Sequence, residues 1–317
     1  MVDTHYDLLT IAYVCYLNND YTKLKIIRDN INNNSGNIKC IFANLYFMSE
    51  EEMKEELHIN YYKKEVSVVE MFKISKDILN HYFPDIDFIY SIEGCDYVSE
   101  EELDELYSLG LSSFTLVWNN ENKYGSGNRT NKGLTKEGVS FIKHAIKLGL
   151  GIDLSHANEN TFNDIINIIK KEKNKVVCFA SHSNSRRLCD KDRNLTDEQL
   201  TLLKQVNGLV GIVSYTPFVS NNKSLSKQEL QSEYLKHIIH VSNIIGETNI
   251  MLATDDMSFS KKHINTAIYD YNNLYNQIKN TLKIIYDDSK INDIMYMNVK
   301  EKIIDKLKER RNRNDRY

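Results

Sequence analysis

The feature that most constrains the fold is the alternation of short apolar runs with longer amphipathic segments along the chain. Such alternation is typical of βα units that build a parallel sheet. We count about eight runs, the number that a closed barrel needs. We therefore expect an α/β protein with a (β/α)8 TIM barrel. The predicted strands are Val2–Tyr6, Ile38–Ala43, Asp87–Ile92, Ser113–Val117, Gly151–Leu154, Val176–Ala180, Leu209–Ser214 and Ile250–Ala253.

The segments between these runs carry signals for helix starts and ends. An N-cap hydroxyl followed three residues later by Glu or Gln satisfies backbone donors that a helix start leaves unpaired. Glycine after a helix is suited to a left-handed C-terminal residue. A further helix is predicted over about Lys136–Leu148, before Gly149. The capping pairs are Ser99 with Glu102, Thr196 with Gln199 and Ser226 with Glu229, and the glycines that follow them are Gly110, Gly208 and Gly246.

The chain offers no boundary between two domains. It has no linker rich in Pro, Gly or Ser and no internal repeat, so one barrel domain over residues 1–317 is preferred to two. The segment from about 300 to 317 is highly charged. We expect Ile303, Ile304 and Leu307 to seat its first turns on the barrel, and residues 310–317 to fray.

Composition excludes several classes of protein. The chain is 41% hydrophobic and 26% charged, which is ordinary for a folded enzyme, and its formal charge of −4 gives no field that attracts nucleic acid or an anionic membrane. No apolar run approaches the length that spans a bilayer. The five cysteines form no CxxC pair, which argues against a disulfide framework or a thiolate zinc site. We expect a cytoplasmic protein with reduced thiols and no nucleic-acid or membrane partner.

Metal-capable side chains fall at or just beyond the carboxyl ends of several predicted strands, where β/α barrels assemble their active sites. His5 and Asp7 end the first strand, and since side chains i and i+2 of an extended segment point to one side, the two can share a metal. The others are Glu93, His156, His182 and Asp255, after the third, fifth, sixth and eighth strands.

Each of these signals is weak alone. A loop histidine beside a turn aspartate, or a hydrogen-bonded histidine at a strand end, is the ordinary alternative for His5, His156 and His182, and a cap or salt-bridge carboxylate is the alternative for Glu93. Two Ser-His dipeptides at equivalent positions make coincidence less plausible. Mixed imidazole and carboxylate ligands suit zinc, although manganese, iron or cobalt use similar sites. A metal-activated water would make the protein a hydrolase.

These motifs, in this order, resemble the membrane (renal) dipeptidase family of zinc metallopeptidases, peptidase family M19, and suggest a soluble member of bacterial type. The resemblance covers nearly the whole chain and implies a metal-binding barrel of the amidohydrolase type. The motifs that carry it include Asp3-Thr4-His5-Tyr6-Asp7, Ile92-Glu93-Gly94, Asp153-Leu154-Ser155-His156, Ser181-His182-Ser183 and Arg193-Asn194.

The resemblance also implies roles. His5 and Asp7 would hold one zinc, His156 and His182 the other, and Glu93 would bridge them. Asp255 matches the acid/base carboxylate that also contacts substrate. Arg193 matches the residue that binds the terminal carboxylate of the substrate, a task that suits a guanidinium fork.

The chain departs from the family pattern at three places. Thr4 replaces a glycine in the opening motif, and Asp256-Met257-Ser258 replaces Phe-Asp-Gly after the last strand. Trp118 stands where well-studied members place a substrate-binding histidine, and an indole cannot accept a proton. Tyr215, beyond the seventh strand, is a candidate wall for a substrate side chain, with simple loop packing as the equal alternative.

The leading hypothesis is therefore a dipeptidase that hydrolyses the peptide bond of small dipeptides with a metal-activated water. A related amidohydrolase acting on N-acyl amino acids or modified peptides is the alternative. A catalytically silent homologue that binds a ligand is a third, disfavoured because all five proposed ligands and Asp255 are present. Family resemblance suggests a homodimer.

Overall fold

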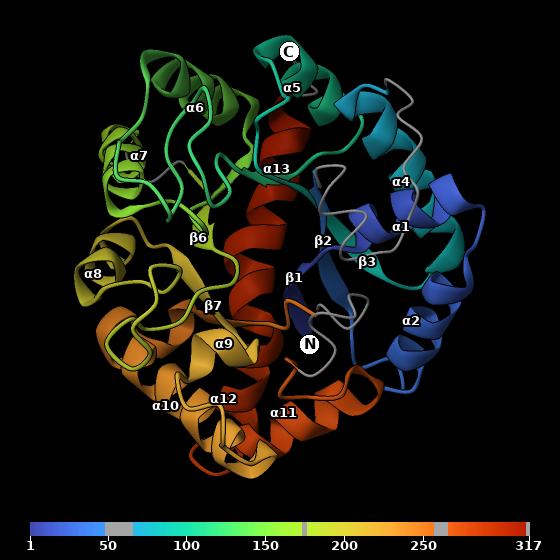
Figure 1. The fold of residues 1–317 in the computed structure, drawn as a ribbon, viewed down its shortest axis with the longest axis vertical. Helices are drawn as coiled ribbons and strands as arrows, with labels where there is room; N and C mark the ends of the chain where they lie inside the picture. The colour runs from blue at the N-terminus through green and yellow to red at the C-terminus, as the bar shows by residue number, and fades with distance from the viewer. Residues whose placement is uncertain (48–65, 173–175, 257–265, 315–317) are drawn as a thin grey trace.

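The computed structural model describes residues 1–47, 66–172, 176–256 and 266–314. Its centre is a sheet of eight parallel strands paired in sequence order, a nearly closed barrel that confirms the predicted fold. Helices surround the strands (Figure 1). The strands are β1 Val2–Tyr6, β2 Cys40–Tyr46, β3 Asp87–Glu93, β4 Ser113–Thr115, β5 Gly151–Asp153, β6 Cys178–Ala180, β7 Leu209–Val213 and β8 Ile250–Ala253.

The register of the strands brings their carboxyl ends level. Tyr46 of β2 pairs with Glu93 of β3, Glu93 pairs with Thr115 of β4, and Thr115 pairs with Asp153 of β5. On the other side of the barrel, the backbone N–H of Asp255 donates to the carbonyl of His5, 3.2 Å away, and so joins the ends of β8 and β1. Residues just beyond these ends therefore gather around one mouth.

Predicted strand ends differ from the observed ones where a residue is buried but is not hydrogen-bonded as part of the sheet. The predicted fourth strand includes Leu116 and Val117, but β4 stops at Thr115 although both residues are buried. The second strand begins at Cys40, later than expected, and continues to Tyr46. An apolar pattern reports burial, whereas a strand also requires ladder partners on its neighbours.

The helices follow the strands as expected, and all three predicted capping boxes form. The predicted helix over Lys136–Leu148 is α6, which ends at Gly149 in the left-handed region with φ 83°. The helices are α1 Leu8–Asn18, α2 Thr22–Asn32, α4 Val68–Tyr82, α5 Glu100–Ser108, α6, α7 Glu159–Lys171, α8 Asp197–Gln205, α9 Thr216–Val219, α10 Lys227–Ile245, α11 Leu274–Leu282, α12 Asp288–Asn292 and α13 Asp305–Asn314. Short 3-10 turns cover Glu247–Asn249 and Tyr271–Asn273, and π-helical turns cover Asp293–Met297 and Lys300–Ile304.

One glycine prediction is wrong. After α8 the left-handed residue is Asn207, with φ 55°, and Gly208 is not among the positive-φ residues. Asparagine tolerates this conformation because its short polar side chain can bond locally. Gly208 has a different reason to be glycine, since a Cβ there would lie 2.6 Å from Leu203 Cδ2.

The charged C-terminal segment covers the amino-terminal end of the barrel, with α13 crossing the middle of Figure 1. Ile303, Ile304 and Leu307 pack against inward-facing strand residues such as Val2 and Phe42, as predicted. The expectation that residues 310–317 fray is wrong for 310–314, which are helical. Arg311 donates to the carbonyls of Tyr107 and Leu111. Residues 315–317 lie outside the described part.

Two expectations concern the chain as a whole. All five cysteines are free thiols, as expected, and all five are buried. Among the described residues, no helix has the length and apolar character needed to cross a bilayer.

Candidate metal centre

The mouth of the barrel gathers the six side chains that the sequence singled out as metal-capable. His5 is the penultimate residue of β1 and Glu93 ends β3, while Asp7, His156, His182 and Asp255 lie just beyond β1, β5, β6 and β8. His5, Glu93 and His182 offer ligand atoms within 4.8 Å of one another, and so do His5, Asp7 and Asp255. The three histidines, Glu93 and Asp7 are all buried, whereas the Asp255 side chain is 14% exposed.

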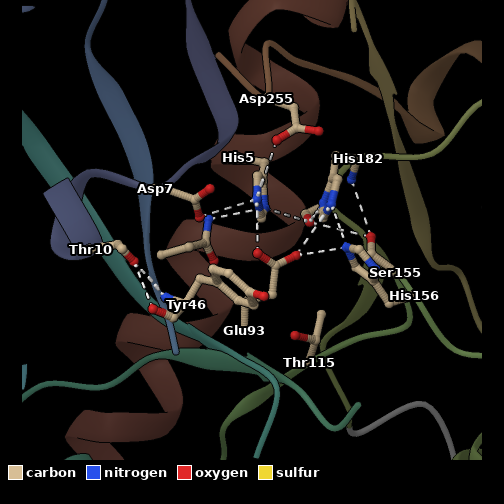
Figure 2. A network of polar contacts seen from close by, with 12 residues as sticks. His5, Asp7, Thr10, Tyr46, Glu93, Thr115, Ser155, His156, His182 and Asp255 are labelled. Carbon is tan, nitrogen blue, oxygen red and sulfur yellow. Dashed lines mark hydrogen bonds and ion pairs between the residues drawn. The ribbon is translucent and has the colours of Figure 1, made fainter. Parts of the chain in front are cut away.

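Glu93 lies at the centre of this cluster. Its carboxylate extends between His5 on one side and His156 and His182 on the other (Figure 2). Oε2 is 3.5 Å from His5 Nε2, and Oε1 is 2.8 Å from His156 Nε2 and 3.4 Å from His182 Nε2. One carboxylate therefore reaches two groups of imidazole ligands.

Each histidine is oriented by a polar partner on its outer nitrogen. Nδ1 of His156 lies 3.0 Å from Asn119 Oδ1, and Nδ1 of His182 lies 2.7 Å from Ser181 Oγ. Nδ1 of His5 lies 3.0 Å from the Asn44 amide. Such partners fix the ring orientation of metal-binding histidines. All three Nε2 atoms consequently face the centre.

A second buried carboxylate, that of Asp153, supports the residues that precede His156 and His182. Asp153 Oδ1 accepts hydrogen bonds from the backbone N–H groups of Ser155 and Ser181, each at 2.9 Å. The Ser155 hydroxyl in turn accepts from the backbone N–H of His182 at 3.3 Å. Asp153 thus ties the ends of β5 and β6 together at the residues that precede the two histidines.

The backbone is strained at two of the cluster residues. His156 has φ 68° and Asp255 has φ 49°, a region that side chains other than glycine rarely occupy. Such conformations cost on the order of 1–3 kcal/mol and concentrate at functional sites. The contact with Asn119 holds the His156 ring, and the backbone bond from Asp255 to the His5 carbonyl holds the chain at Asp255.

The electrostatics of the cluster favour a positive charge at its centre. Burial acts to lower the pKa of His5, but the carboxylates of Glu93, Asp7 and Asp255 overcome it and raise that pKa to about 10. Burial acts to raise the pKa of Glu93, yet His5 and His156 hold it well below its usual range. Burial and Arg193 lower the pKa of His156 to about 3, so this ring is a neutral donor at pH 7.

The donor set fits a divalent metal. Within the described part of the chain, buried Glu93 Oε1 accepts no hydrogen bond, although two imidazole nitrogens lie within 3.4 Å of it. The Nε2 atoms of His156 and His182 face each other at 3.1 Å. Imidazole nitrogen and carboxylate oxygen in one buried cluster are ligands that zinc and its first-row neighbours accept.

Arg193 is buried beside the cluster with much of its hydrogen-bonding capacity unused. Its Nη1 donates to Ser183 Oγ at 3.0 Å, while Nε and Nη2 are buried and have no hydrogen-bond partner in the described structure. Burial lowers its pKa to about 10, and the nearby carboxylates of Glu93 and Asp255 oppose that shift. An unpaired buried donor is costly, so these two nitrogens are suited to an incoming anion.

The two predicted aromatic contacts lie on different sides of the mouth. The Trp118 ring is 5.8 Å from the His156 ring and 4.7 Å from the Tyr46 ring. Tyr215 packs on Phe218 at 5.0 Å, and the guanidinium of Arg193 lies 5.8 Å from the Phe218 ring. Trp118 therefore borders the cluster itself, whereas Tyr215 packs on Phe218, which lies against Arg193.

The two other departures from the family pattern also lie close to the centre. Thr4 faces the barrel interior, where its hydroxyl donates to the carbonyls of Ser181 at 2.7 Å and Leu252 at 3.0 Å. Asp256 is buried, but Met257 and Ser258 lie outside the described residues.

Sequence reasoning missed the residues that orient the three histidines. Asn44, Asn119 and Ser181 contact the outer histidine nitrogens, and Asp153 holds Ser181. Asp153 carried a signal, since a carboxylate inside an apolar run needs buried partners. Asn44 and Asn119 are ordinary asparagines in the sequence, and only the fold identifies their roles.

Comparison with known proteins agrees with this geometry. The model of the membrane dipeptidase family, peptidase family M19, matches residues 5–316. An uncharacterised protein of Klebsiella pneumoniae is 32% identical over 174 residues, which are 52% of this chain and 62% of that protein. An uncharacterised dipeptidase of Schizosaccharomyces pombe is 29% identical over 59% of this chain and 44% of its own length. The matched stretch thus spans about half the length of these relatives.

Solved structures show the same fold. A metallopeptidase of Rhodobacter sphaeroides, solved with a phosphinate mimic of the dipeptide L-Ala-D-Ala, superposes with a TM-score of 0.73. The superposition covers 97% of this chain and 98% of that one, at 19% sequence identity.

Proposed function

Because the chain belongs to the membrane dipeptidase family, peptidase family M19, we propose that it is a metal-dependent dipeptidase. The proposal names zinc as the metal, with two ions per chain. His5 and Asp7 would hold one ion and His156 and His182 the other, with Glu93 between them. Zinc bound in such a site lowers the pKa of a water molecule to about 7 and polarises a substrate carbonyl.

The observation that carries the proposal is the pairing of this donor cluster with Arg193. Nε and Nη2 of Arg193 are buried and have no hydrogen-bond partner among the described residues, and the charges of Glu93 and Asp255 raise the pKa of this guanidinium against the effect of burial. A guanidinium binds a planar carboxylate in bidentate fashion. If Arg193 binds the substrate's carboxylate and the bond to be hydrolysed lies over the cluster, only one residue separates that bond from the free C-terminus. A dipeptide has this arrangement.

The remaining chain groups fit hydrolysis of that bond. Asp255 extends over His5, with Oδ1 3.9 Å from Nε2 (Figure 2). Burial raises its pKa, which favours a carboxyl group able to take a proton and return it. We assign Asp255 the transfer of a proton from the attacking water to the leaving amine. Asn119 and Ser181 keep the histidine rings oriented meanwhile.

A second candidate has one observation in its favour. An N-acyl amino acid offers Arg193 the same carboxylate, and the Trp118 indole has no acceptor for the free amino group that distinguishes a dipeptide. A related amidohydrolase acting on N-acyl amino acids is therefore the alternative.

The test is hydrolysis of a substrate panel by protein reconstituted with zinc. The panel contains dipeptides with L- and D-configured C-terminal residues, the corresponding N-acetyl amino acids, and a tripeptide. We expect dipeptides to be cleaved fastest, and His182→Ala to lose turnover while keeping the wild-type circular dichroism spectrum. Preferred cleavage of N-acetyl amino acids would select the alternative, and turnover by His182→Ala would refute the proposed site.

A further inference from the structure

We propose that Trp118 and Tyr46 form the binding surface for the side chain of the substrate's first residue and select large apolar or aromatic side chains there. This inference rests on the proposed dipeptidase function. It concerns Trp118, the position at which the resemblance implies a substrate-binding histidine.

The two rings form one surface beside the metal centre. The Trp118 and Tyr46 rings lie 4.7 Å apart at an angle of 41°, and the Trp118 ring lies 5.8 Å from that of His156. Tyr46 ends β2 in register with Glu93, the central carboxylate of the cluster. Trp118 and Tyr46 are each only half-buried, so part of this surface is open to a ligand.

The surface is built into the fold at the level of the backbone. A Cβ on Gly127 would lie 1.8 Å from the carbonyl oxygen of Trp118, so only glycine permits this approach of the loop. Asn119, the residue after Trp118, holds the His156 ring through a contact of 3.0 Å between Asn119 Oδ1 and His156 Nδ1. The guanidinium of Arg129 lies 5.9 Å from the indole centre, within range of a cation–π interaction. The indole is thus tied to the same loop that orients a proposed ligand.

The position of Arg193 gives the direction of the substrate. Arg193 follows β6 and lies against Phe218, which follows β7. Tyr46 ends β2 and Trp118 follows β4, and in Figure 1 β2 and β3 lie across the barrel from β6 and β7. A dipeptide with its carboxylate on Arg193 and its peptide bond over the cluster must direct its first residue away from Arg193, toward Trp118 and Tyr46.

The chemistry of this surface is apolar. An indole carries one N–H donor and no acceptor, and it presents a large aromatic face. A substrate whose first residue has no side chain therefore gains little binding free energy from the indole, whereas a side chain that covers the ring gains much. Pockets of this kind discriminate by roughly 10–200-fold per apolar group.

Trp118 is the only tryptophan in the chain, so its fluorescence reports on this surface alone. The probes are phosphinic analogues of Phe-Ala and Gly-Ala, titrated into the zinc-loaded enzyme. We expect the Phe-Ala analogue to change the emission of Trp118 and to bind at least about tenfold more tightly than the Gly-Ala analogue. Equal affinities, or tight binding that leaves the emission unchanged, would overturn the inference.

Variants separate the surface from the rest of the site, with affinities measured by calorimetry. Trp118→Ala should reduce the preference for the Phe-Ala analogue to within about twofold, and Trp118→Phe should retain most of it. Tyr16→Ala, at an exposed aromatic residue of α1, is the matched control and should keep the wild-type preference. A preference that survives in both Trp118→Ala and Tyr46→Ala would contradict the inference.

Failure of the proposed function gives a different result. If the zinc-loaded enzyme binds neither analogue and cleaves no dipeptide, both the function and this surface are wrong. If it binds both analogues equally and cleaves dipeptides, only the surface is wrong.

Discussion

The two sides of the barrel mouth are held by different forces. On the β5 to β7 side, His156, His182 and Arg193 are buried among hydrogen-bonded polar groups, with Arg193 only 5% exposed. On the β2 to β4 side, Tyr46 and Trp118 are half-buried and meet through ring contacts. Directional hydrogen bonds fix atoms to within a fraction of an ångström, whereas ring packing tolerates exchange. The polar side is therefore suited to chemistry and the aromatic side to selectivity.

This difference predicts how the two sides respond to mutation. On the polar side a lost partner leaves a buried group unsatisfied, which costs more than the contact itself contributes. On the aromatic side a lost ring removes contact area and alters preference among substrates. Variants of the first kind should reduce every activity, and variants of the second kind should change ratios.

The largest effect is expected at Glu93, which both groups of histidines face. Glu93→Gln keeps the shape of the side chain but removes its charge. We expect kcat to fall by roughly 1000-fold or more, about 4 kcal/mol in barrier, with a parallel loss of zinc affinity. Steady-state kinetics and a zinc competition titration measure both. Glu121→Gln, at a surface carboxylate paired with Lys132, is the control and should change neither. Near-normal zinc affinity in Glu93→Gln would exclude Glu93 as a ligand.

The next largest effect is expected at Arg193. Arg193→Ala should reduce kcat/KM for a dipeptide by roughly 100-fold, because it removes a buried charged partner of the substrate carboxylate. The same dipeptide with an amidated C-terminus should be cleaved slowly, and at similar rates, by wild type and variant. If Arg193→Ala affected the free and amidated substrates equally, the guanidinium would be structural and would not bind carboxylate.

A third prediction concerns the pH dependence of stability, through a buried histidine that supports the polar side. Buried His237 accepts a hydrogen bond from the Ser185 N–H at 3.1 Å, and its Nε2 lies 3.0 Å from the Val219 carbonyl. Burial lowers its pKa to about 4. The unfolded chain takes up a proton near pH 6.5 and the folded chain does so only near pH 4. Stability from this group is therefore complete above pH 6.5 and falls as pH drops through that window, by about 3 kcal/mol.

Urea unfolding at several pH values checks this prediction. His237→Gln should show a smaller loss of stability between pH 6.5 and 4 than wild type. Ile26→Ala, at an exposed residue of α2 that carries no titrating group, should retain the wild-type slope. An unchanged slope in His237→Gln would show that other groups account for the acid sensitivity.

The smallest effect is expected at Thr4, which joins β1 to the polar side through the Ser181 carbonyl. Thr4→Val keeps the volume and removes the hydroxyl, and it should cost about 1 kcal/mol in the free energy of unfolding. Thr4→Ser should cost less, since it keeps the donor. A Thr4→Val protein as stable as wild type would mean that the hydroxyl's bonds to the Ser181 and Leu252 carbonyls contribute no net free energy to folding.

The sequence predicted much of the polar side and little of the aromatic one. Strand order, capping boxes and the convergence of His5, Glu93 and His182 follow from periodicity and from where strands end in a barrel. Trp118, beyond the end of β4, meets Tyr46 at the end of β2, and the geometry of this contact depends on the approach of Gly127, which no local pattern reveals. The role of Asn119 depends on the same loop.

Strand and helix ends show the same limit. Leu116 and Val117 are apolar and buried, as the pattern indicated, but they lie outside β4, where the Leu116 carbonyl accepts from the Cys95 N–H beyond β3. The charged residues 310–314 looked disordered by composition, yet Arg311 bonds to two carbonyls near α5 and the helix continues. Hydrogen bonds between segments distant in the sequence therefore determine where β4 and α13 end.

The central claim is that the buried imidazole and carboxylate cluster holds metal. The most direct test is elemental analysis of purified protein after equilibration with zinc and removal of the unbound ion. The account predicts about two zinc ions per chain in the wild type, and fewer than one in Glu93→Gln. Wild-type protein that retains no zinc, or a Glu93→Gln variant that retains the full complement, would contradict it.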